Sequence, residues 1–486
     1  MTTHLEGRRR RAKIVATLGP ASSDAATIHA MVRAGMDVAR LNFSHGDHAT
    51  LRTLVTHVRA AERDLGHAVA ILGDLQGPKI RIGWLDAPLD LAAGQLLTIA
   101  FDSRPSSATT VGSDYPGLVD DVSVNNTIYL KDGAIELGVT AVKPSAIETI
   151  VRTAGRLTSR AGVNIPGIDV RLPPLTDKDL DDLRFADEQD FDYLALSFVR
   201  RAEDIAKARR ALAAIDSSMM LIAKIENTLA LDNLNDIVAA ADGVMVARGD
   251  LGVEVGPESV PVWQRRIIRA GGDHLVPVII ATQMLESMVE NSRPSRAEAS
   301  DVANAVWDGA DALMLSAESA VAADPVRTVE MMARIIDRAE EDEGSRHTST
   351  FETDWSQDPS RSISWAIRSI VQQNANIKGV VAFTISGYTA RLIAKDRIRV
   401  PVLVLAPNRS VERRAALLWG VQPVPCPPPE DLESMLRAVD DVARAQIGGR
   451  DGDLIILAGG IPLDEGKPTN FLKLHRIGES SAADRD

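Results

Sequence analysis

The sequence holds a single cysteine, Cys426, among its 486 residues, and it has no long apolar run. One cysteine excludes an intramolecular disulfide and suits a reducing cytoplasm. No apolar stretch reaches the ~18 residues that a membrane-spanning helix needs. The run Arg8–Arg11 is not followed by the apolar core of a signal peptide. We therefore expect a cytoplasmic protein with no membrane partner.

A surplus of basic residues and a P-loop are also missing. The formal net charge of −13 argues against a nucleic-acid partner, because nucleic-acid binding normally needs a basic face. The stretch Gly460–Lys467 has neither the spacing nor the Ser or Thr of a P-loop, so any nucleotide must be held in another way. The length predicts more than one domain, because domains usually run to ~50–250 residues.

Apolar strand patterns and amphipathic helix patterns, such as a helix expected over Leu229–Ala240, alternate through most of the chain. Eight such units remain when residues 84–168 are left out, which predicts an α/β fold built on a (β/α)8 TIM barrel. Polar residues follow the strands at their carboxyl ends, where barrel enzymes carry their active sites. They are Arg40, Asn42, Ser44, Asp74, Lys224, Glu226, Asp250, Thr282, Ser316 and Glu318.

Two segments break this alternation. Residues 84–168 carry short alternating strands and turns with no good helix, which predicts a small β-barrel lid domain inserted in a barrel loop. Beyond a polar linker, Glu340–Asp358, one helix and three strands predict a C-terminal α/β domain. The expected domains are the barrel over residues 1–83 and 169–343, the lid over 84–168 and the C-terminal domain over 344–486.

In two neighbouring units, charged residues follow an apolar strand. Met219–Ala223 is followed by Lys224 and Glu226, and Val244–Ala247 is followed by Asp250. On adjacent parallel strands the two carboxylates would repel each other unless a cation such as Mg²⁺ or Mn²⁺ lay between them. Lys224 shares a strand face with Glu226. A metal beside an ammonium suits phosphate or enolate oxygens. The alternative is a surface salt bridge at two strand ends.

The chain resembles the pyruvate kinase family over nearly its whole length and in its domain order. The motifs that carry the resemblance are Thr17–Ser22, Arg40–Gly46, Gly77–Arg81, Lys224–Asn227, Ala247–Glu254, Ala281–Met288 and Met314–Glu318. Each motif is weak alone, but their order and number are specific. The resemblance implies transfer of the phosphoryl group of phosphoenolpyruvate to ADP in glycolysis, giving pyruvate and ATP. It also implies Mg²⁺ or Mn²⁺ as cofactor and a homotetramer.

Carried over residue by residue, the resemblance puts the divalent metal on Glu226 and Asp250, in agreement with the charge pattern. Lys224 should bridge the moving phosphoryl group and the enolate oxygen, because phosphoryl transfer depends mainly on positioning and charge neutralisation. The substrate carboxylate should be held by the backbone at Ala247, Arg248, Gly249 and Asp250.

The resemblance also assigns roles to strand-end residues in other units. Arg40 should clamp phosphate with its planar guanidinium. Thr282 should belong to the relay that protonates the enolate, and the alternative is a strand-end hydroxyl bonded to backbone. The implied nucleotide contacts are Pro20, Arg40, His45, Arg81 and Arg160.

The chain departs from the family pattern at the implied monovalent-cation site, which consists of Asn42, Ser44, Asp74 and Leu75. Lys79 stands where many members carry Glu, and Leu75 replaces a Thr. In the family Glu goes with potassium dependence and Lys with independence. An ammonium supplies the positive charge that K⁺ would supply and repels an arriving cation. We therefore expect that K⁺ is not required. The alternative is that Lys79 points outward and pairs with a lid carboxylate.

A loop in the C-terminal domain resembles the family's phosphate-binding loop for activators. Hydroxyls and amides between a strand and a helix make an anion nest, here at Thr384, Ser386, Gly387 and Thr389. The implied ligand is a sugar-phosphate or nucleotide effector. The alternative is an ordinary strand-to-helix cap.

Two other functions stay open at this point. A metal-dependent lyase or aldolase acting on a pyruvate enolate would share Glu226 and Asp250, but it would not need Arg40 or the lid. A catalytically silent metabolite sensor would use the C-terminal domain alone, and an intact Lys224 and Thr282 speak against it.

Overall fold

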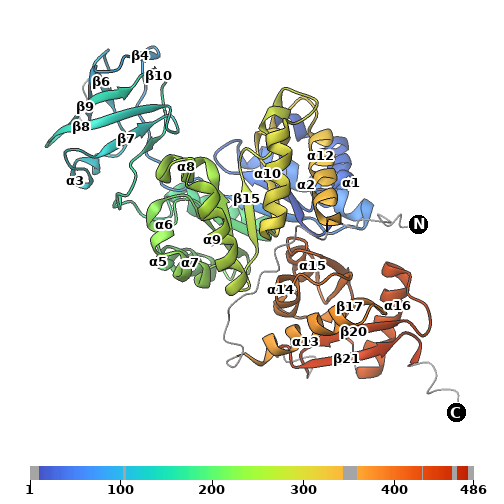
Figure 1. Ribbon diagram of the computed structural model, residues 1–486. Helices are drawn as coiled ribbons and strands as arrows, with labels where there is room; N and C mark the ends of the chain where they lie inside the picture. Colours follow the sequence, from blue (N-terminus) through green and yellow to red (C-terminus); the bar gives the residue numbers. More distant parts are fainter. Residues whose placement is uncertain (1–9, 102–105, 343–357, 430, 462–467, 480–486) are drawn as a thin grey trace. The chain divides into compact units, whose positions relative to one another are not determined.

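The structure is a computed structural model that describes residues 10–101, 106–342, 358–429, 431–461 and 468–479. The chain is drawn as a ribbon in Figure 1. Eight strands close into a barrel in the order β1-β2-β3-β12-β13-β14-β15-β16. They are β1 Lys13–Thr17, β2 Val38–Asn42, β3 Ala70–Asp74, β12 Tyr193–Leu196, β13 Met220–Ile225, β14 Gly243–Ala247, β15 Val278–Ala281 and β16 Ala312–Leu315. Their continuous apolar runs are typical of parallel strands covered on both faces. The predicted barrel is confirmed.

Local signals explain where some barrel helices, including α1, α2 and α10, begin and end. In α1, Ala25–Ala34, the Asp24 side chain accepts a hydrogen bond at the start and Gly35 follows the end. The same asymmetry of a polar cap and a closing glycine is expected for helices in general. The others are α2 His48–Leu65, α4 Asp177–Glu188, α5 Ala202–Ala213, α6 Thr228–Asp232, α7 Leu234–Ala240, α9 Val260–Asp273, α10 Arg296–Asp308 and α12 Pro325–Glu341.

The single helix predicted over Leu229–Ala240 is wrong, because the structure has two helices, α6 and α7, that meet at Asn233. The Asn233 side chain donates to the carbonyls of Arg200 and Leu229 at 3.1 and 2.9 Å. A side chain that bonds the backbone in this way competes with the helical pattern. The break therefore depends on a contact with a distant residue, which helical periodicity does not report.

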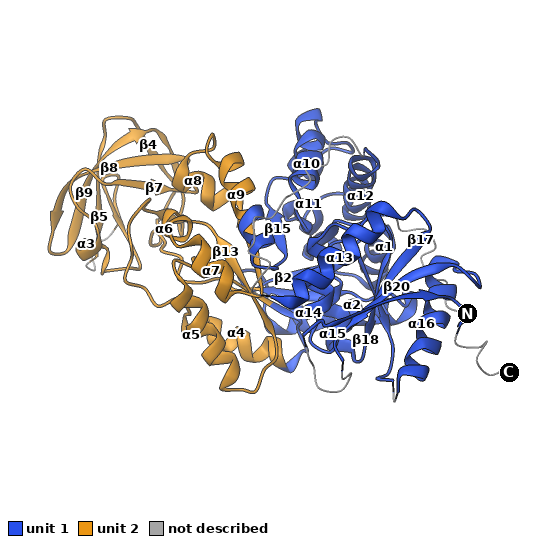
Figure 2. Cartoon of the chain, turned by 60° about the horizontal axis from the view of Figure 1, so that its bottom comes forward, with its two compact units in different colours: residues 1–73, 188–193, 268–486 blue, residues 74–187, 194–267 orange. Residues whose placement is uncertain are grey.

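The chain divides into two compact units, each described by itself below (Figure 2). One comprises residues 1–73, 188–193 and 268–486, and the other comprises residues 74–187 and 194–267. The first therefore holds the C-terminal domain, and the second holds the inserted segment.

The inserted segment is built from two sheets. The six-stranded sheet has the order β11-β7-β8-β9-β5-β6, and a two-stranded sheet pairs β10 with β4. Fully buried aliphatic side chains such as Ile99, Leu137 and Ile147 form its core. The strands are β4 Leu89–Leu91, β5 Leu96–Ala100, β6 Thr110–Gly112, β7 Thr127–Leu130, β8 Ile135–Lys143, β9 Ala146–Thr153, β10 Gly155–Leu157 and β11 Val163–Asn164.

One short helix in this segment, α3 Leu118–Asp121, was not predicted. Its last residue, Asp121, accepts hydrogen bonds from the Tyr115 hydroxyl at 2.5 Å and from Arg171 at 2.8 Å. A single turn has no periodicity to read, and these side-chain contacts hold it in place.

The C-terminal domain is a five-stranded sheet in the order β19-β18-β17-β20-β21, in which β21 runs antiparallel to β20. Alternate residues of β17 enter two separate cores, Val380 in one and Val381 in the other. Its elements are α13 Pro359–Gln373, β17 Ile377–Phe383, α14 Tyr388–Lys395, β18 Val402–Ala406, α15 Arg409–Ala415, β19 Val421–Pro425, α16 Leu432–Ile447, β20 Leu454–Gly459 and β21 Phe471–Arg476. Most of the predicted linker lies outside the described residues.

A buried ionic cluster joins this domain to the barrel strands of the same unit. Lys395, at the end of α14, donates to Asp311 at 2.5 Å, and Arg397 lies 3.1 Å from the same carboxylate. Asp311 directly precedes β16 and also accepts from the Val278 amide at the start of β15. Removing one partner of such a buried pair is strongly destabilising, because the other charge is left uncompensated.

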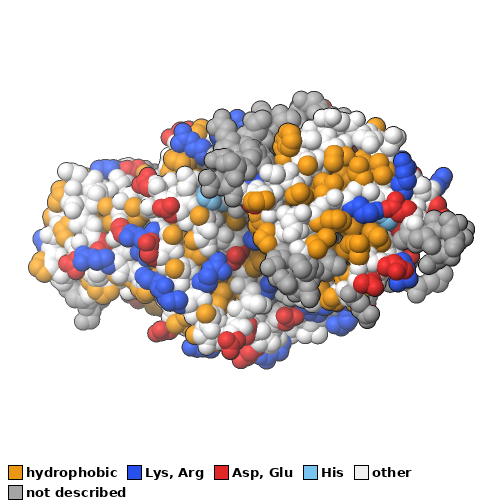
Figure 3. Space-filling model, turned by 90° about the horizontal axis from the view of Figure 1, so that it is seen from below, with side chains coloured by type: hydrophobic (Ala, Val, Ile, Leu, Met, Phe, Trp, Pro, Cys, Tyr) orange, Lys and Arg blue, Asp and Glu red, His pale blue; other side chains and the backbone are white. Residues whose placement is uncertain are grey.

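On the face shown in Figure 3, Lys and Arg side chains are interspersed with Asp and Glu rather than gathered into one basic patch. Within the described part of the chain, no helix is both long enough and apolar enough to cross a membrane.

The C-terminal domain generates a prediction about pH. Burial raises the pKa of Asp396 to about 6 from 3.8, although the Ser364 hydroxyl donates to it and Arg368 and Arg361 lower it. The folded state then holds an extra proton between pH ~4 and ~6, so this group lowers the free energy of unfolding as pH rises through that window. We expect the free energy of unfolding of Asp396→Asn to rise by about 2–3 kcal/mol relative to that of the wild type between pH 4 and pH 7. Urea unfolding at both pH values measures this difference.

The matched control is Asp441→Asn, because Asp441 lies on α16 with a side chain that is 82% exposed. The difference in unfolding free energy between Asp441→Asn and the wild type should change little between the two pH values. If the difference between Asp396→Asn and the wild type were also the same at both pH values, the raised pKa of Asp396 would be contradicted.

Candidate active site

Two carboxylates stand at one edge of adjacent strands, as the sequence predicts. Strands β13 and β14 pair in parallel, with Lys224 opposite Met245. Glu226 follows β13 and is buried, and Asp250 lies in the first turn of α8, Arg248–Val255, which begins directly after β14. Burial raises the pKa of Glu226 and the charge of Asp250 raises it further, while Lys224 lowers it. Burial and the nearby Asp250 therefore both disfavour the charged form of Glu226, which Lys224 favours.

The ammonium of Lys224 lies in the middle of this cluster. Its Nζ is 2.8 Å from Glu226 and 3.3 Å from Asp74. It also donates to the Ser197 hydroxyl at 2.7 Å, and Ser197 in turn donates to the Leu75 carbonyl at 2.8 Å. Ser197 was missed in the sequence, although its place directly after β12 was a usable signal. These contacts fix one positive charge at the strand ends.

Glu226 is held on its other side by a backbone amide. The Phe198 N–H donates to its Oε2 at 2.7 Å. Phe198 has a φ of 56°, an uncommon conformation for a bulky residue. Backbone strain of this kind collects at functional sites, where the surroundings enforce it. No feature of the sequence indicates this contact.

Lys79 lies near one of the predicted metal ligands. Its Nζ is 3.9 Å from Asp250 and 3.3 Å from Asp132 in the inserted segment. The Asp132 contact is the lid pairing that the alternative interpretation anticipated, whereas the approach to Asp250 was not anticipated. Asp74 contacts Lys224 instead, and Leu75 is buried with an apolar side chain that offers no cation ligand.

The segment Arg248–Asp250 is the first turn of α8 rather than a loop. Amides at a helix N-terminus point outward, and the helix dipole favours negative charge there. The arrangement suits the carboxylate-binding role expected for Ala247, Arg248, Gly249 and Asp250.

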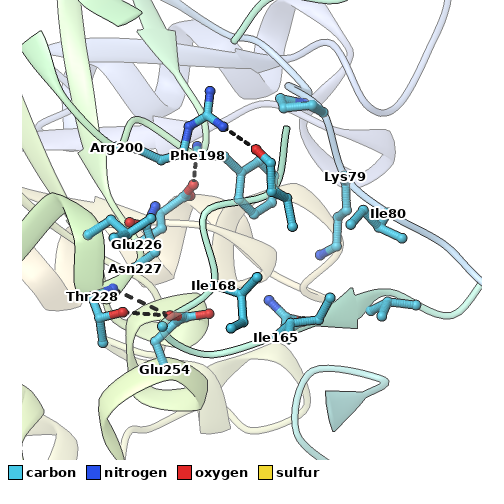
Figure 4. A pocket seen from close by; sticks show the side chains of 16 residues that line it. Lys79, Ile80, Ile165, Ile168, Phe198, Arg200, Glu226, Asn227, Thr228 and Glu254 are labelled. Atoms are coloured by element: carbon cyan, nitrogen blue, oxygen red, sulfur yellow. Dashed lines mark hydrogen bonds between the residues drawn. The ribbon is translucent and has the colours of Figure 1, made fainter. Parts of the chain in front are cut away.

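A small cavity of about 70 Å³ lies beside Glu226 (Figure 4). Figure 4 shows Phe198 bonded to Glu226 at one wall and Thr228 bonded to Glu254 at another. Burial raises the pKa of Glu254, while hydrogen bonds from Thr228 and the Gly167 amide lower it. Glu254 was read in the sequence only as part of a motif.

Two predicted nucleotide contacts come together in the same unit. Arg81 donates to the Arg160 carbonyl at 3.0 Å, and Arg160 pairs with Asp114 at 3.1 Å. The other three, Pro20, Arg40 and His45, belong to the other unit.

In that unit, Arg40 donates to the Thr17 hydroxyl at 2.9 Å, which orients the guanidinium at the end of β2. The Asn42 side chain accepts from the Ser44 amide at 2.9 Å, and the His45 amide donates to the Asn42 carbonyl at 3.1 Å. These contacts make the turn after β2. No group of three or more His, Cys, Asp or Glu among the described residues is placed to hold a metal.

Thr282 follows β15 and donates its hydroxyl to the Ala281 carbonyl at 2.7 Å, as the plain alternative anticipated. Its φ of 69° is an outlier for a β-branched residue. The turn that follows is held by buried Glu318, which accepts from the amides of Met284 and Leu285 at 3.1 and 3.2 Å. The sequence pattern places Glu318 at a strand end but indicates no role for it.

The predicted effector loop is engaged in its own turn. The Gly387 amide donates to the Thr384 hydroxyl at 3.0 Å, and the Tyr388 amide donates to Ser386 at 3.4 Å. Thr389 shares a hydrogen bond of 2.8 Å with Thr469. These contacts match a strand-to-helix cap.

Comparison with known proteins agrees with the geometry. The family model "Pyruvate kinase, barrel domain" matches residues 9–329, and "Pyruvate kinase, alpha/beta domain" matches residues 361–475. A pyruvate kinase of Geobacillus stearothermophilus is 41% identical over 478 residues, covering 97% of this chain and 81% of the relative. A pyruvate kinase of Corynebacterium glutamicum is 41% identical over 473 residues, covering 97% of this chain and 98% of the relative. A crystal structure of a pyruvate kinase from Cryptosporidium parvum matches with a TM-score of 0.89 and 32% identity, covering 96% of each chain.

The partly buried ammonium of Lys224 generates a prediction about stability. Lys224→Met would remove this positive charge from beside the buried carboxylates of Glu226 and Asp74, so we expect the free energy of unfolding to fall by about 3–5 kcal/mol in EDTA. Lys143→Met is the control, because its pair with Glu148 is exposed and worth no more than about 1 kcal/mol. Equal losses in urea unfolding would show that the Lys224 cluster does not stabilise the fold.

Proposed function

The chain belongs to the pyruvate kinase family and is a phosphotransferase, and from this premise we propose that it transfers the phosphoryl group of phosphoenolpyruvate to ADP in glycolysis, giving pyruvate and ATP. The observation that carries the proposal is the Lys224 ammonium, 2.8 Å from buried Glu226 at the strand ends beside Asp250. A fixed cation among metal-ligating carboxylates suits a reaction in which negative charge moves between oxygens.

The residues present fit a divalent cation. Glu226 and Asp250 would hold Mg²⁺ or Mn²⁺, because carboxylate oxygens are the ligands that these ions prefer. The raised pKa of Glu226 reflects negative charge in a buried place that a cation would neutralise. When bound, such an ion supplies charge neutralisation for phosphate and enolate oxygens.

The chain's own residues would act as follows. The amides at the start of α8 bind the substrate carboxylate, and Lys224, oriented by Ser197, faces the oxygen that bridges phosphorus and enolate. That oxygen–phosphorus bond breaks as a terminal oxygen of ADP bonds to phosphorus. The released enolate takes a proton on its methylene carbon, through a relay that we assign to Thr282. We assign phosphate binding to Arg40, which Thr17 orients.

The rival functions are weaker. A lyase or aldolase would have no use for Arg81 and Arg160, which the structure brings together at the edge of the inserted segment. A silent sensor would have no use for the pair of Lys224 with buried Glu226, because burying a charged carboxylate costs free energy. A coupled assay with phosphoenolpyruvate, ADP and Mg²⁺ separates all three functions.

The first prediction concerns the metal ligands. Glu226→Gln and Asp250→Asn each remove a charged ligand, so we expect weaker Mn²⁺ binding and a loss of turnover of about 10²-fold or more. Mn²⁺ binding without substrate and the coupled assay measure the two effects. The control is Asp181→Asn on the exposed side of α4, with a side chain that is 69% exposed. Wild-type activity at low metal in either ligand variant would remove the assignment.

The second prediction concerns potassium. We propose that Lys79, 3.9 Å from Asp250, supplies the positive charge that K⁺ supplies in relatives with Glu, so activity should not need K⁺. Replacing K⁺ by a bulky cation at constant ionic strength should leave the rate unchanged, and Lys79→Glu should make it respond to K⁺. A tenfold increase in the rate of the wild-type enzyme on addition of K⁺ would contradict the proposal.

We also propose a homotetramer and a phosphorylated effector, a sugar phosphate or nucleotide, at Thr384, Ser386, Gly387 and Thr389. The support is the left-handed Gly387, with a φ of 82° at the start of α14. Successive amides around such a residue form an anion nest.

A further inference from the structure

The chain leaves the inserted segment through residues 169–172, here called the exit segment, which lie between β11 and α4. No helix or strand includes these four residues. Their position must therefore be set by contacts with other segments, because backbone groups outside regular structure still need hydrogen-bond partners. Two arginines supply such contacts.

Arg200, in the loop after β12, holds the backbone of the exit segment. Its guanidinium donates to the Val170 carbonyl at 2.5 Å and to the Leu172 carbonyl at 3.0 Å. It also lies 3.4 Å from the Asp169 carboxylate, and its side chain is only 12% exposed. Figure 4 shows the bond from Arg200 as a dashed line at the edge of the cavity. The five N–H donors of a guanidinium allow one side chain to hold three positions of an extended chain.

Arg200 is itself fixed in place by buried Asp204 in the first turn of α5. The Asp204 carboxylate accepts from the Arg200 amide at 3.1 Å and from the Arg200 Nε at 3.3 Å, and its side chain is 3% exposed. The Arg200 carbonyl accepts from the Asn233 side chain at 3.1 Å. Both the backbone and the side chain of Arg200 are therefore held by other residues.

Arg171 ties the same exit segment to the inserted domain. Its side chain donates to the Asp121 carboxylate at 2.8 Å and to the Asp120 carbonyl at 3.0 Å, and both partners belong to α3. Its neighbours Val170 and Leu172 are the residues whose carbonyls Arg200 binds. The exit segment therefore connects α3 of the insert to the loop after β12 through hydrogen bonds.

The loop that carries Arg200 also makes two contacts of the candidate active site. The Ser197 hydroxyl accepts from the Lys224 ammonium, and the Phe198 amide donates to Glu226, each at 2.7 Å. Arg200 follows within three residues of both. The attachment of the inserted domain and the orientation of the charge cluster thus depend on one short loop.

We propose that Arg200 is a positioning residue, which fixes the inserted domain to the loop that orients Lys224 and Glu226 and so keeps Arg81 and Arg160 in place for ADP. The inference rests on the proposed function, because it requires that ADP is a substrate. A guanidinium suits the task, because its fork of fixed donors binds several oxygens in one geometry. Arg200 acts through the exit segment and touches neither substrate.

The test replaces Arg200 by lysine, which keeps the positive charge. One ammonium cannot reproduce the fork that binds two carbonyls, so the exit segment should lose part of its attachment. We expect Arg200→Lys to raise KM for ADP by about 5-fold or more, because Arg81 and Arg160 would be misplaced. The matched control is Arg201→Lys, because Arg201 pairs with the Asp169 carboxylate and its side chain is 43% exposed. Its KM for ADP should match that of the wild type, since an exposed pair contributes little.

Binding of Mn²⁺ without substrate separates positioning from general damage to the site. In Arg200→Lys, Mn²⁺ affinity and KM for phosphoenolpyruvate should match those of the wild type, because Ser197 and Phe198 keep their own bonds to Lys224 and Glu226. Weaker Mn²⁺ binding in Arg200→Lys, or an unchanged KM for ADP, would overturn the proposal.

Hydrogen–deuterium exchange tests the attachment directly. The Val170 amide donates to the Ile168 carbonyl at 3.1 Å, and the Arg171 amide donates to Asp121 at 3.3 Å. Both amides should exchange faster in Arg200→Lys than in the wild type, because the exit segment would be held less firmly. Equal exchange in the two proteins would also overturn the proposal.

A second variant covers the case in which Arg200→Lys folds poorly. Asp169→Asn removes one contact of Arg200 at a side chain that is 45% exposed, and it should raise the same exchange and KM for ADP by less. No change in either quantity would then count against the proposal. If the wild type lacks pyruvate kinase activity, the proposed function fails, while the exchange result still decides whether Arg200 holds the exit segment.

Discussion

The rest of the site depends on the contacts of the partly buried Lys224 ammonium with two buried carboxylates. The ammonium lies 2.8 Å from Glu226 and 3.3 Å from Asp74, two carboxylates whose own side chains are almost completely buried. Without a compensating cation, the desolvation free energy of these carboxylates would be far larger than the stabilisation from their hydrogen bonds. The strand ends are therefore organised to hold this charge, with Ser197 bonded to the ammonium and the Phe198 amide bonded to Glu226.

Helix α8 connects this charge cluster to the inserted domain. Its first turn carries Asp250 and the amides suited to a carboxylate, while Val253 lies close to Gly133 of the insert and Glu254 accepts from Thr228. One short element thus presents backbone amides at its end and contacts the inserted domain on its side. This division follows from helical geometry, because amides emerge at the N-terminus whereas side chains three and four residues apart share a face.

Much of the fold was predictable because short stretches of sequence indicate it. Continuous apolar strands, Asp24 before α1 and Gly35 after it, and the change to short alternating strands after residue 84 each report on nearby residues. The failures were long-range in origin. The break at Asn233 depends on Arg200, and α3 depends on a contact between Asp121 and Arg171. In the C-terminal domain, β19 contains two prolines, which argue against a strand, and it lies at the sheet edge where proline is tolerated.

By itself the sequence determined that Lys224 and Glu226 share a strand face, and that Asp250 follows the next strand, because strand periodicity is local. Only the tertiary structure decided which groups surround them. Ser197 and Phe198 come from β12's end, and Lys79 reaches Asp250 from the entry to the insert. Glu254 accepts hydrogen bonds from Thr228 across 26 positions of chain. Such partners are set by how the strands are ordered in the barrel and by where the insert returns, and no spacing within one motif encodes either.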